Sequence, residues 1–277
     1  MSLSARILRF PVQPEKTWLS PQEAEVEASD YLAIPIEERS AVDRERVLSN
    51  PDVLLSLCAG LRRDATPAVM EREAREAYEW ISRPGFSLGL FDERDYALGE
   101  FALLASGASR LLGKREEALL WLDRAEAGFR HTMNPAPGLA NVAYMRLALR
   151  FEMGRYQHVL ELAPSLESSF RKLRMEVEAA KCTLLLAMTL KQTGEHVRAI
   201  ESLGELHDAP ALRNDAPLRA RILSELGDLR QLEGQLHLAM TAFQKALALL
   251  KDGNVSPARA DLKLYVGGVH RAMGALE

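Results

Sequence analysis

Apolar residues recur along most of the chain at the three- and four-residue spacing of an amphipathic helix. One stripe of a helical projection, for example, carries Val69, Ala74, Ala77, Tyr78 and Ile81. Alternation with a period of two residues, which is typical of half-buried strands, never exceeds the helical period over a long window. The pattern therefore predicts an all-α protein.

Glycines divide the later part of the chain into segments of nearly equal length. They stand at steps of 41, 40, 40 and 40 residues: Gly113, Gly154, Gly194, Gly234 and Gly274. Each follows a helix-like stretch, and glycine is favoured just past a helix end because it adopts a positive φ without a Cβ clash. A ladder of this kind is the signature of a helical repeat array.

The predicted repeats occupy residues 94–277 as four helix pairs and a terminal helix. In each pair the first helix ends at a ladder glycine and the second begins just after it. The pairs are 94–112 with 114–130, 138–153 with 155–171, 174–193 with 195–206, and 216–233 with 235–251, and the terminal helix is 257–273.

The chain before the repeats divides into two predicted parts. Residues 1–19 are expected to form an extended arm, and residues 20–85 a small helical N-terminal region. A capping residue followed by proline predicts three helix starts in this region, at Ser20, Asn50 and Thr66. A further helix is expected from Pro35 to Leu48, and the apolar connector 86–93 is the predicted boundary with the repeats.

Composition narrows the class of protein further. Hydrophobic residues make up 47% of the chain and charged residues 27%, which excludes a wholly disordered chain. The formal net charge of −4 argues against a strongly basic nucleic-acid-binding domain. Cys58 and Cys182 lie far apart in apolar stretches, which favours two reduced core thiols. With no long apolar run and no signal peptide expected, a cytoplasmic location is the most economical prediction.

The sequence contains no convincing motif for catalysis, metal binding or cofactor binding. The stretch from Gly107 to Lys114 departs from a phosphate-binding loop, because five residues separate its glycines and Arg115 replaces the required Ser or Thr. The six histidines form no i,i+4 metal-binding pair, and those early in second helices (His158, His196 and His237) are expected to be exposed. Trp121 is predicted to be a packing residue. We therefore expect no catalytic residue, metal or cofactor and no enzymatic activity.

The fourth repeat resembles the tetratricopeptide repeat (TPR) at its leucine, small and aromatic positions, which are Leu226, Gly227, Gly234, Ala239, Phe243 and Ala246. Close packing of two helices needs small side chains at their crossing. The position five residues after each glycine fits this need with Ala118, Val159, Ala199 and Ala239, and the position twelve after it less well with Ala125, Leu166, Leu206 and Ala246. The tyrosine expected two residues after the glycine is present as Tyr156 alone. The period of forty makes the resemblance one to an extended, bacterial-type TPR variant over residues 94–274.

This resemblance implies a right-handed α-solenoid of antiparallel helix pairs that binds a peptide or protein segment in its concave groove. The positions 13, 10, 6 and 3 residues before each turn glycine face that groove in the family. Carried over here, they are Glu100, Leu103, Arg110, Asn141, Tyr144, Phe151, Lys181, Leu184, Met188, Lys191, Arg221, Ser224, Asp228 and Gln231. Lys181, Lys191 and Arg221 suit an acidic peptide.

Other functions stay open at this level. The segment 29–39 loosely resembles bacterial repeat proteins associated with transcription regulators, so residues 20–83 are a candidate contact for DNA or a regulator. The arginines there (Arg39, Arg44 and Arg46) are expected to be neutralised by their acidic neighbours Glu37, Glu38, Asp43 and Glu45. A third reading is a small-molecule-sensing accessory protein that uses the groove.

The terminal helix carries more apolar residues than one narrow stripe holds: Leu262, Leu264, Tyr265, Val266, Val269 and Met273. We expect it to be broadly buried or to contact a partner, including a second copy of the chain in a homodimer.

Overall fold

The chain forms an array of helices, described here by a computed structural model for residues 19–86, 93–250 and 257–274. All regular structure in these residues is helical. The N-terminal helices are α1 (Pro21–Ala33), the 3₁₀ turn η1 (Ile36–Glu38), α2 (Ala41–Leu48), α3 (Pro51–Asp64) and α4 (Pro67–Ile81). They are followed by α5 (Glu93–Leu111), α6 (Arg115–Arg130), α7 (Ala136–Glu152), α8 (Tyr156–Lys172), α9 (Glu176–Gln192), α10 (His196–Leu206), the 3₁₀ turn η2 (Pro210–Leu212), α11 (Ala216–Leu232), α12 (Leu236–Leu249) and α13 (Pro257–Gly274).

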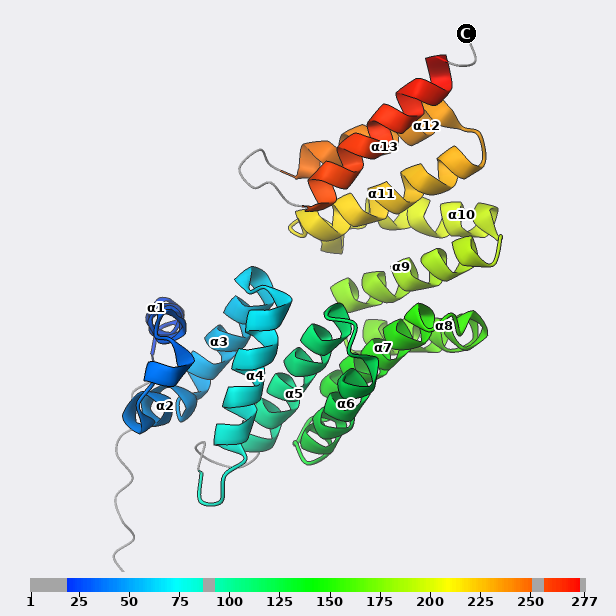
Figure 1. Ribbon diagram of the computed structural model, residues 1–277. Helices are drawn as coiled ribbons and strands as arrows, with labels where there is room; N and C mark the ends of the chain where they lie inside the picture. Colours follow the sequence, from blue (N-terminus) through cyan, green and yellow to red (C-terminus); the bar gives the residue numbers. More distant parts are fainter. Residues whose placement is uncertain (1–18, 87–92, 251–256, 275–277) are drawn as a thin grey trace, which may run out of the picture.

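Neighbouring helices stack in chain order into a solenoid, with α1 and α13 at opposite ends (Figure 1). Within each pair the first helix packs on the second, as α5 does on α6 and α11 on α12. The second helix then packs on the first helix of the next pair, as α8 does on α9. The predicted all-α solenoid of paired helices is thereby confirmed, and the helix bounds in the repeats agree with the predicted ones to within about two residues.

Four of the five ladder glycines adopt the left-handed backbone that the sequence predicts. Their φ angles lie between 71° and 83° at Gly113, Gly154, Gly194 and Gly234. The residue after each glycine donates a backbone hydrogen bond across the turn, as Glu195 N does to Leu190 O at 2.8 Å. This bond satisfies a carbonyl at the helix end. Gly274 differs, because it lies in α13 as its last residue and its φ is outside the left-handed range.

Capping explains where the N-terminal helices begin. As predicted, α1, α3 and α4 start at prolines that follow Ser20, Asn50 and Thr66, and each of these side chains accepts a hydrogen bond from the first turn. The predicted helix from Pro35 to Leu48 is wrong. Ser40 instead caps the shorter α2, since its hydroxyl accepts from Asp43 N at 3.1 Å while Asp43 accepts from Ser40 N at 2.9 Å. Such a capping box fixes a helix start.

Part of the packing pattern of the repeats extends to α3 and α4, although these two helices do not pack on each other as α5 does on α6. Helix α3 packs against α5 as α5 packs against α7, and α4 packs against α5 as α6 packs against α7. One core cluster runs through both regions and includes Leu57, Ile81, Phe101 and Leu149. The division of the chain at 86–93 stays a prediction. Residues 87–92 of that connector and residues 1–18 of the predicted arm lie outside the described residues.

Helix α13 turns most of its apolar residues toward the array. Leu262 and Val269 are buried, Val266 and Met273 pack beside them, and Tyr265 stacks on Phe243 with ring centroids 5.3 Å apart. Leu264 at 74% exposure and Tyr265 at 42% exposure are the more exposed members of the set. The buried face of α13 is therefore narrower than the broad burial that the sequence suggested for this helix. In the described part of the chain, no helix has both the length and the apolar character needed to cross a membrane.

Candidate functional site

A cavity of about 500 Å³ opens where the first helices of successive pairs lie side by side. We call it the central groove. Seven of the residues predicted to face the groove line it: Arg110, Tyr144, Phe151, Lys181, Leu184, Met188 and Arg221. The other lining residues are Met145, Ala148, Glu152, Leu185, Asp215, Pro217 and Leu218. The lining thus comes from α5, α7, α9 and the start of α11.

The repeat spacing brings these side chains together. Arg110 and Phe151 stand three residues before their turn glycines, and Lys181 and Arg221 stand thirteen before theirs. Equivalent positions lie on equivalent faces of neighbouring first helices, which pack against each other from α5 to α11. Residues at equivalent positions of successive repeats therefore form one continuous wall of the groove.

Aromatic contacts hold the apolar wall of the groove in place. The Tyr144 ring meets Phe170 edge-on with centroids 6.4 Å apart, and the Phe151 ring lies 5.6 Å from that of Tyr156. Burial raises the pKa of Tyr144, so its hydroxyl stays neutral at physiological pH. Leu184 is buried beneath this wall. The groove therefore offers a preformed apolar surface.

Cationic groups at the groove are incompletely neutralised. Arg221 is exposed, and its guanidinium donates a hydrogen bond to the Met188 sulfur at 3.9 Å. Among the described residues, no carboxylate forms an ion pair with it. The Lys181 ammonium lies 3.7 Å from the Glu178 carboxylate, at the long end of an ion pair. Arg110 pairs with Glu152, but its buried Nε has no hydrogen-bond partner in the described part of the chain.

The acidic groups at the groove already have partners. Glu152 pairs with Arg110, and Asp215 caps α11 by accepting from Leu218 N at 3.0 Å. The free hydrogen-bonding capacity at the groove therefore belongs mainly to cations. Such an arrangement favours an anionic group on the ligand.

Lys191 does not serve the groove as predicted. Its ammonium lies 2.6 Å from Glu225 and 2.8 Å from Asp228, and it joins α9 to α11. Burial lowers the pKa of Lys191, but the hydrogen bonds that its ammonium donates to both carboxylates outweigh this and hold the pKa above its usual value. Lys191 and Asp228 are therefore internal partners, because the two predicted groove positions fall opposite each other on neighbouring helices.

The first repeat also departs from the prediction. Glu100 is 7% exposed and pairs with Arg62 in a different pocket, and Leu103 is buried in the core, because α3 covers this face of α5. The remaining predicted residues, Asn141, Ser224 and Gln231, are half-buried on their helices and do not line the central groove.

Sequence positions alone could not reveal the lining residues at the start of α11. Asp215, Pro217 and Leu218 lie more than thirteen residues before their turn glycine, yet they close one side of the groove. They reach it because α11 begins opposite the middle of α9. This stagger between successive helices has no signature in the glycine spacing.

The N-terminal arginines form ion pairs with carboxylates of the same chain. Arg39 is 4% exposed, pairs with Glu73 at 2.6 Å and places its guanidinium 4.2 Å from the centre of the Tyr31 ring. Arg44 pairs with Glu76 at 2.7 Å, and Arg46 pairs with Glu27. Carboxylates of α4 and α1 thus neutralise these arginines. The sequence had instead predicted that their acidic neighbours along the chain would do so.

Other predicted packing residues are where they were expected. Cys58 and Cys182 are buried and free, and burial raises the pKa of each thiol to about 12. Trp121 is buried with its ring edge-on to Tyr78 at 5.2 Å.

Of the histidines early in second helices, His158 and His237 are exposed as expected. His196 is half-buried, 2.7 Å from Glu233, because the two side chains meet between neighbouring helix pairs. Within the described residues, no group of three or more His, Cys, Asp or Glu side chains is placed to hold a metal ion.

Comparison with known proteins adds information on the fold. No family profile matches the chain, and no curated protein matches it. Among solved structures it is similar to the crystal structure of BtubC (BKLC) from P. vanneervenii, at 20% sequence identity and a TM-score of 0.57. The match covers 77% of this chain and 84% of that chain. At this identity the likeness supports the helical-array fold.

Proposed function

We propose that the chain is a non-enzymatic protein-interaction module, an extended TPR-type array whose central groove binds an extended, acidic segment of a partner protein. The observation that carries this proposal is the combination in one groove of a preformed apolar wall and incompletely neutralised cations. Tyr144, Phe151 and Met188 supply the wall, and Lys181 and Arg221 supply the charge.

The chemistry of the groove suits a peptide better than a compact charged ligand. Apolar contacts provide affinity without direction, whereas ion pairs and hydrogen bonds set the register of an extended chain. We infer a ligand that places an aliphatic or aromatic side chain on the Tyr144–Phe151 wall and a neighbouring carboxylate near Arg221.

A peptide array tests this proposal. Wild-type protein is applied to extended peptides in which acidic, neutral or basic residues flank one apolar residue, and affinities of the best binders are measured by fluorescence anisotropy. We expect acidic peptides to bind best, more weakly at higher salt. The double substitution Lys181→Ala with Arg221→Ala should weaken binding by about tenfold or more.

The matched control is Lys245→Ala, which removes an exposed lysine from α12. It should leave peptide affinity unchanged. Equal affinity of the wild type and the double variant for acidic peptides would overturn the assignment of the central groove.

The same proposal covers the cellular compartment, the kind of partner and self-association. Two buried free thiols are in keeping with a reducing compartment, so we place the protein in the cytoplasm. The arginines of α2 form ion pairs with Glu76 and Glu27 of the same chain, which favours a protein partner over DNA. Self-association through α13 would use exposed Leu264 and half-exposed Tyr265, and Leu264→Lys should then convert a dimer to a monomer in light scattering.

A further inference from the structure

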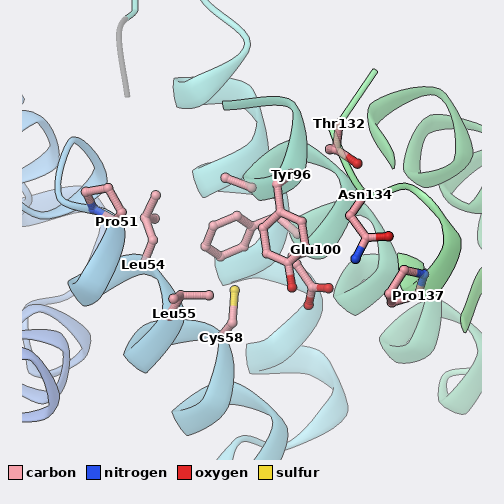
Figure 2. A pocket seen from close by; sticks show the side chains of 11 residues that line it. Pro51, Leu54, Leu55, Cys58, Tyr96, Glu100, Thr132, Asn134 and Pro137 are labelled. Carbon is pink, nitrogen blue, oxygen red and sulfur yellow. The ribbon is translucent and has the colours of Figure 1, made fainter. Parts of the chain in front are cut away.

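A second cavity, of about 430 Å³, lies between the N-terminal halves of α3 and α5 (Figure 2). We call it the α3–α5 pocket. Its lining also includes residues before and at the start of α7, and consists of Pro51, Leu54, Leu55, Cys58, Tyr96, Ala97, Glu100, Phe101, Thr132, Asn134 and Pro137. Its volume falls in the roughly 300–1,000 Å³ range of small-molecule sites.

Most of the wall is apolar and fixed by packing. Leu54, Cys58 and Phe101 are at most 5% exposed, and the small side chain of Ala97 leaves space between the two helices. The Tyr96 ring meets Phe129 edge-on at 5.8 Å between centroids. Figure 2 shows the Tyr96 ring and the Cys58 sulfur facing the same space. The pocket is therefore preformed.

Polar groups meet at one edge of this pocket. Glu100 is 7% exposed, and its carboxylate pairs with Arg62. Burial, together with the charge of the nearby Glu100 carboxylate, raises the pKa of Tyr96 to about 12. Tyr96 is thus neutral, and the charge of Glu100 is balanced by Arg62. Figure 2 shows the Asn134 amide reaching toward the same region from the other side.

The charge balance selects the class of ligand. A charged ligand entering this apolar space would lose hydration without a free counter-ion, which is costly. An uncharged ligand avoids that cost, and a hydroxyl or N–H group can hydrogen-bond the oxygens of Glu100 and Tyr96 or the Asn134 amide. We propose that the α3–α5 pocket is a binding site for an uncharged, largely apolar small molecule that carries one such hydrogen-bonding group.

Three probes of equal ring size test this proposal: 2-phenylethanol, 2-phenylethylammonium and phenylacetate. Binding to the full chain is measured by ligand-observed NMR and isothermal titration calorimetry. We expect 2-phenylethanol to bind about tenfold more tightly than either charged probe, the equivalent of one unfavourable polar burial. Failure of 2-phenylethanol to bind, or equal binding of all three probes, would overturn the proposal.

Substitutions locate the binding. Leu55 is 55% exposed at the pocket, so Leu55→Trp should block it while the protein stays folded. The matched control is Leu238→Trp on α12, where the leucine is 48% exposed. We expect Leu55→Trp to weaken 2-phenylethanol binding by about tenfold and Leu238→Trp to have no effect. Unchanged binding in Leu55→Trp would place the probe elsewhere and contradict the assignment.

The pocket is independent of the proposed peptide groove, and the experiment separates the two. The double variant Lys181→Ala with Arg221→Ala should bind 2-phenylethanol as the wild type does. Displacement of the probe by an acidic peptide from the array would assign the pocket to the peptide site and overturn the small-molecule proposal.

Discussion

Gly194 and Gly234 are positions where backbone conformation alone dictates the residue. Their φ angles are 83° and 73°, and an added Cβ would meet no heavy atom within 4 Å. The cost of Gly→Ala at either position is therefore backbone strain, and we expect a loss of about 1 kcal/mol in the free energy of unfolding. Urea denaturation measures this loss.

Gly204 in α10 is the matched control for these substitutions. It also has open space around it, but its φ lies outside the left-handed range. Gly204→Ala should therefore stabilise the protein by about 0.5–1 kcal/mol through helix propensity. A stabilising effect of alanine at Gly194 and Gly234 as well would show that those turns are not left-handed.

Gly227 is required for a different reason, which is the close approach of α12 to α11. A Cβ at this position would lie 2.6 Å from the Phe243 ring. Gly227→Ala should destabilise the protein by about 1–3 kcal/mol through overpacking. Partial recovery in the double variant with Phe243→Leu, measured by the same denaturation, would confirm contact as the cause, and purely additive losses would contradict it.

At the scale of helices, prediction succeeded where a local residue decides the backbone. Glycine at a left-handed position and a cap followed by proline each define a helix end without help from the rest of the chain. The turn between α8 and α9 was predicted from the helix bounds, but its left-handed residue was not, because Arg174 adopts φ 59° there in place of a glycine. The packing of α3 and α4 on α5 escaped this reasoning, since the turn between α3 and α4 uses extended Ala65 and the cap Thr66 in place of a glycine.

Helix α4 is tied to the repeats by a buried carboxylate. Glu71 is 8% exposed and accepts hydrogen bonds from Lys114 at 2.7 Å and from Ser109 at 2.9 Å. Burial raises the pKa of Glu71, but these hydrogen bonds outweigh it and hold the pKa below its ordinary value of 4.5. A lowered carboxyl pKa in the folded state stabilises the protein above the unfolded pKa, and the gain is lost as pH falls.

We therefore expect the stability difference between wild type and Glu71→Gln to be largest near neutral pH and to shrink below pH 4.5. Denaturation as a function of pH measures this difference. Glu205→Gln, which alters an exposed glutamate on α10, should give a small difference that does not change with pH. A Glu71→Gln difference that stays constant down to strongly acidic pH would contradict the ionic role of Glu71.

At the scale of the whole molecule, seven of the fourteen positions that the repeat spacing predicted to face the groove line it. The spacing could not predict which charges on the first helices neutralise one another. Lys191 meets Glu225 and Asp228 because α9 and α11 pack at a particular stagger, and Glu100 is covered because α3 continues the array. The ion pairs of Lys191 and the burial of Glu100 both depend on how neighbouring helix pairs are arranged.

The central groove is consequently shorter than the full inner surface and is centred on α7 and α9. Its apolar wall and its cations come from positions forty residues apart that the solenoid brings side by side. A ligand that contacts Arg110 and Arg221 together must span from α5 to α11. This geometry explains why the proposed ligand is extended.

Methyl NMR of the methionines during titration with the best acidic peptide tests the central claim most directly. Met145 and Met188 line the central groove, whereas Met70 packs against the N-terminal core and Met240 against the α11–α13 core. We predict that the Met145 and Met188 methyl signals shift at saturation while those of Met70 and Met240 stay unchanged. Saturable binding that leaves the Met145 and Met188 signals in place would contradict the account.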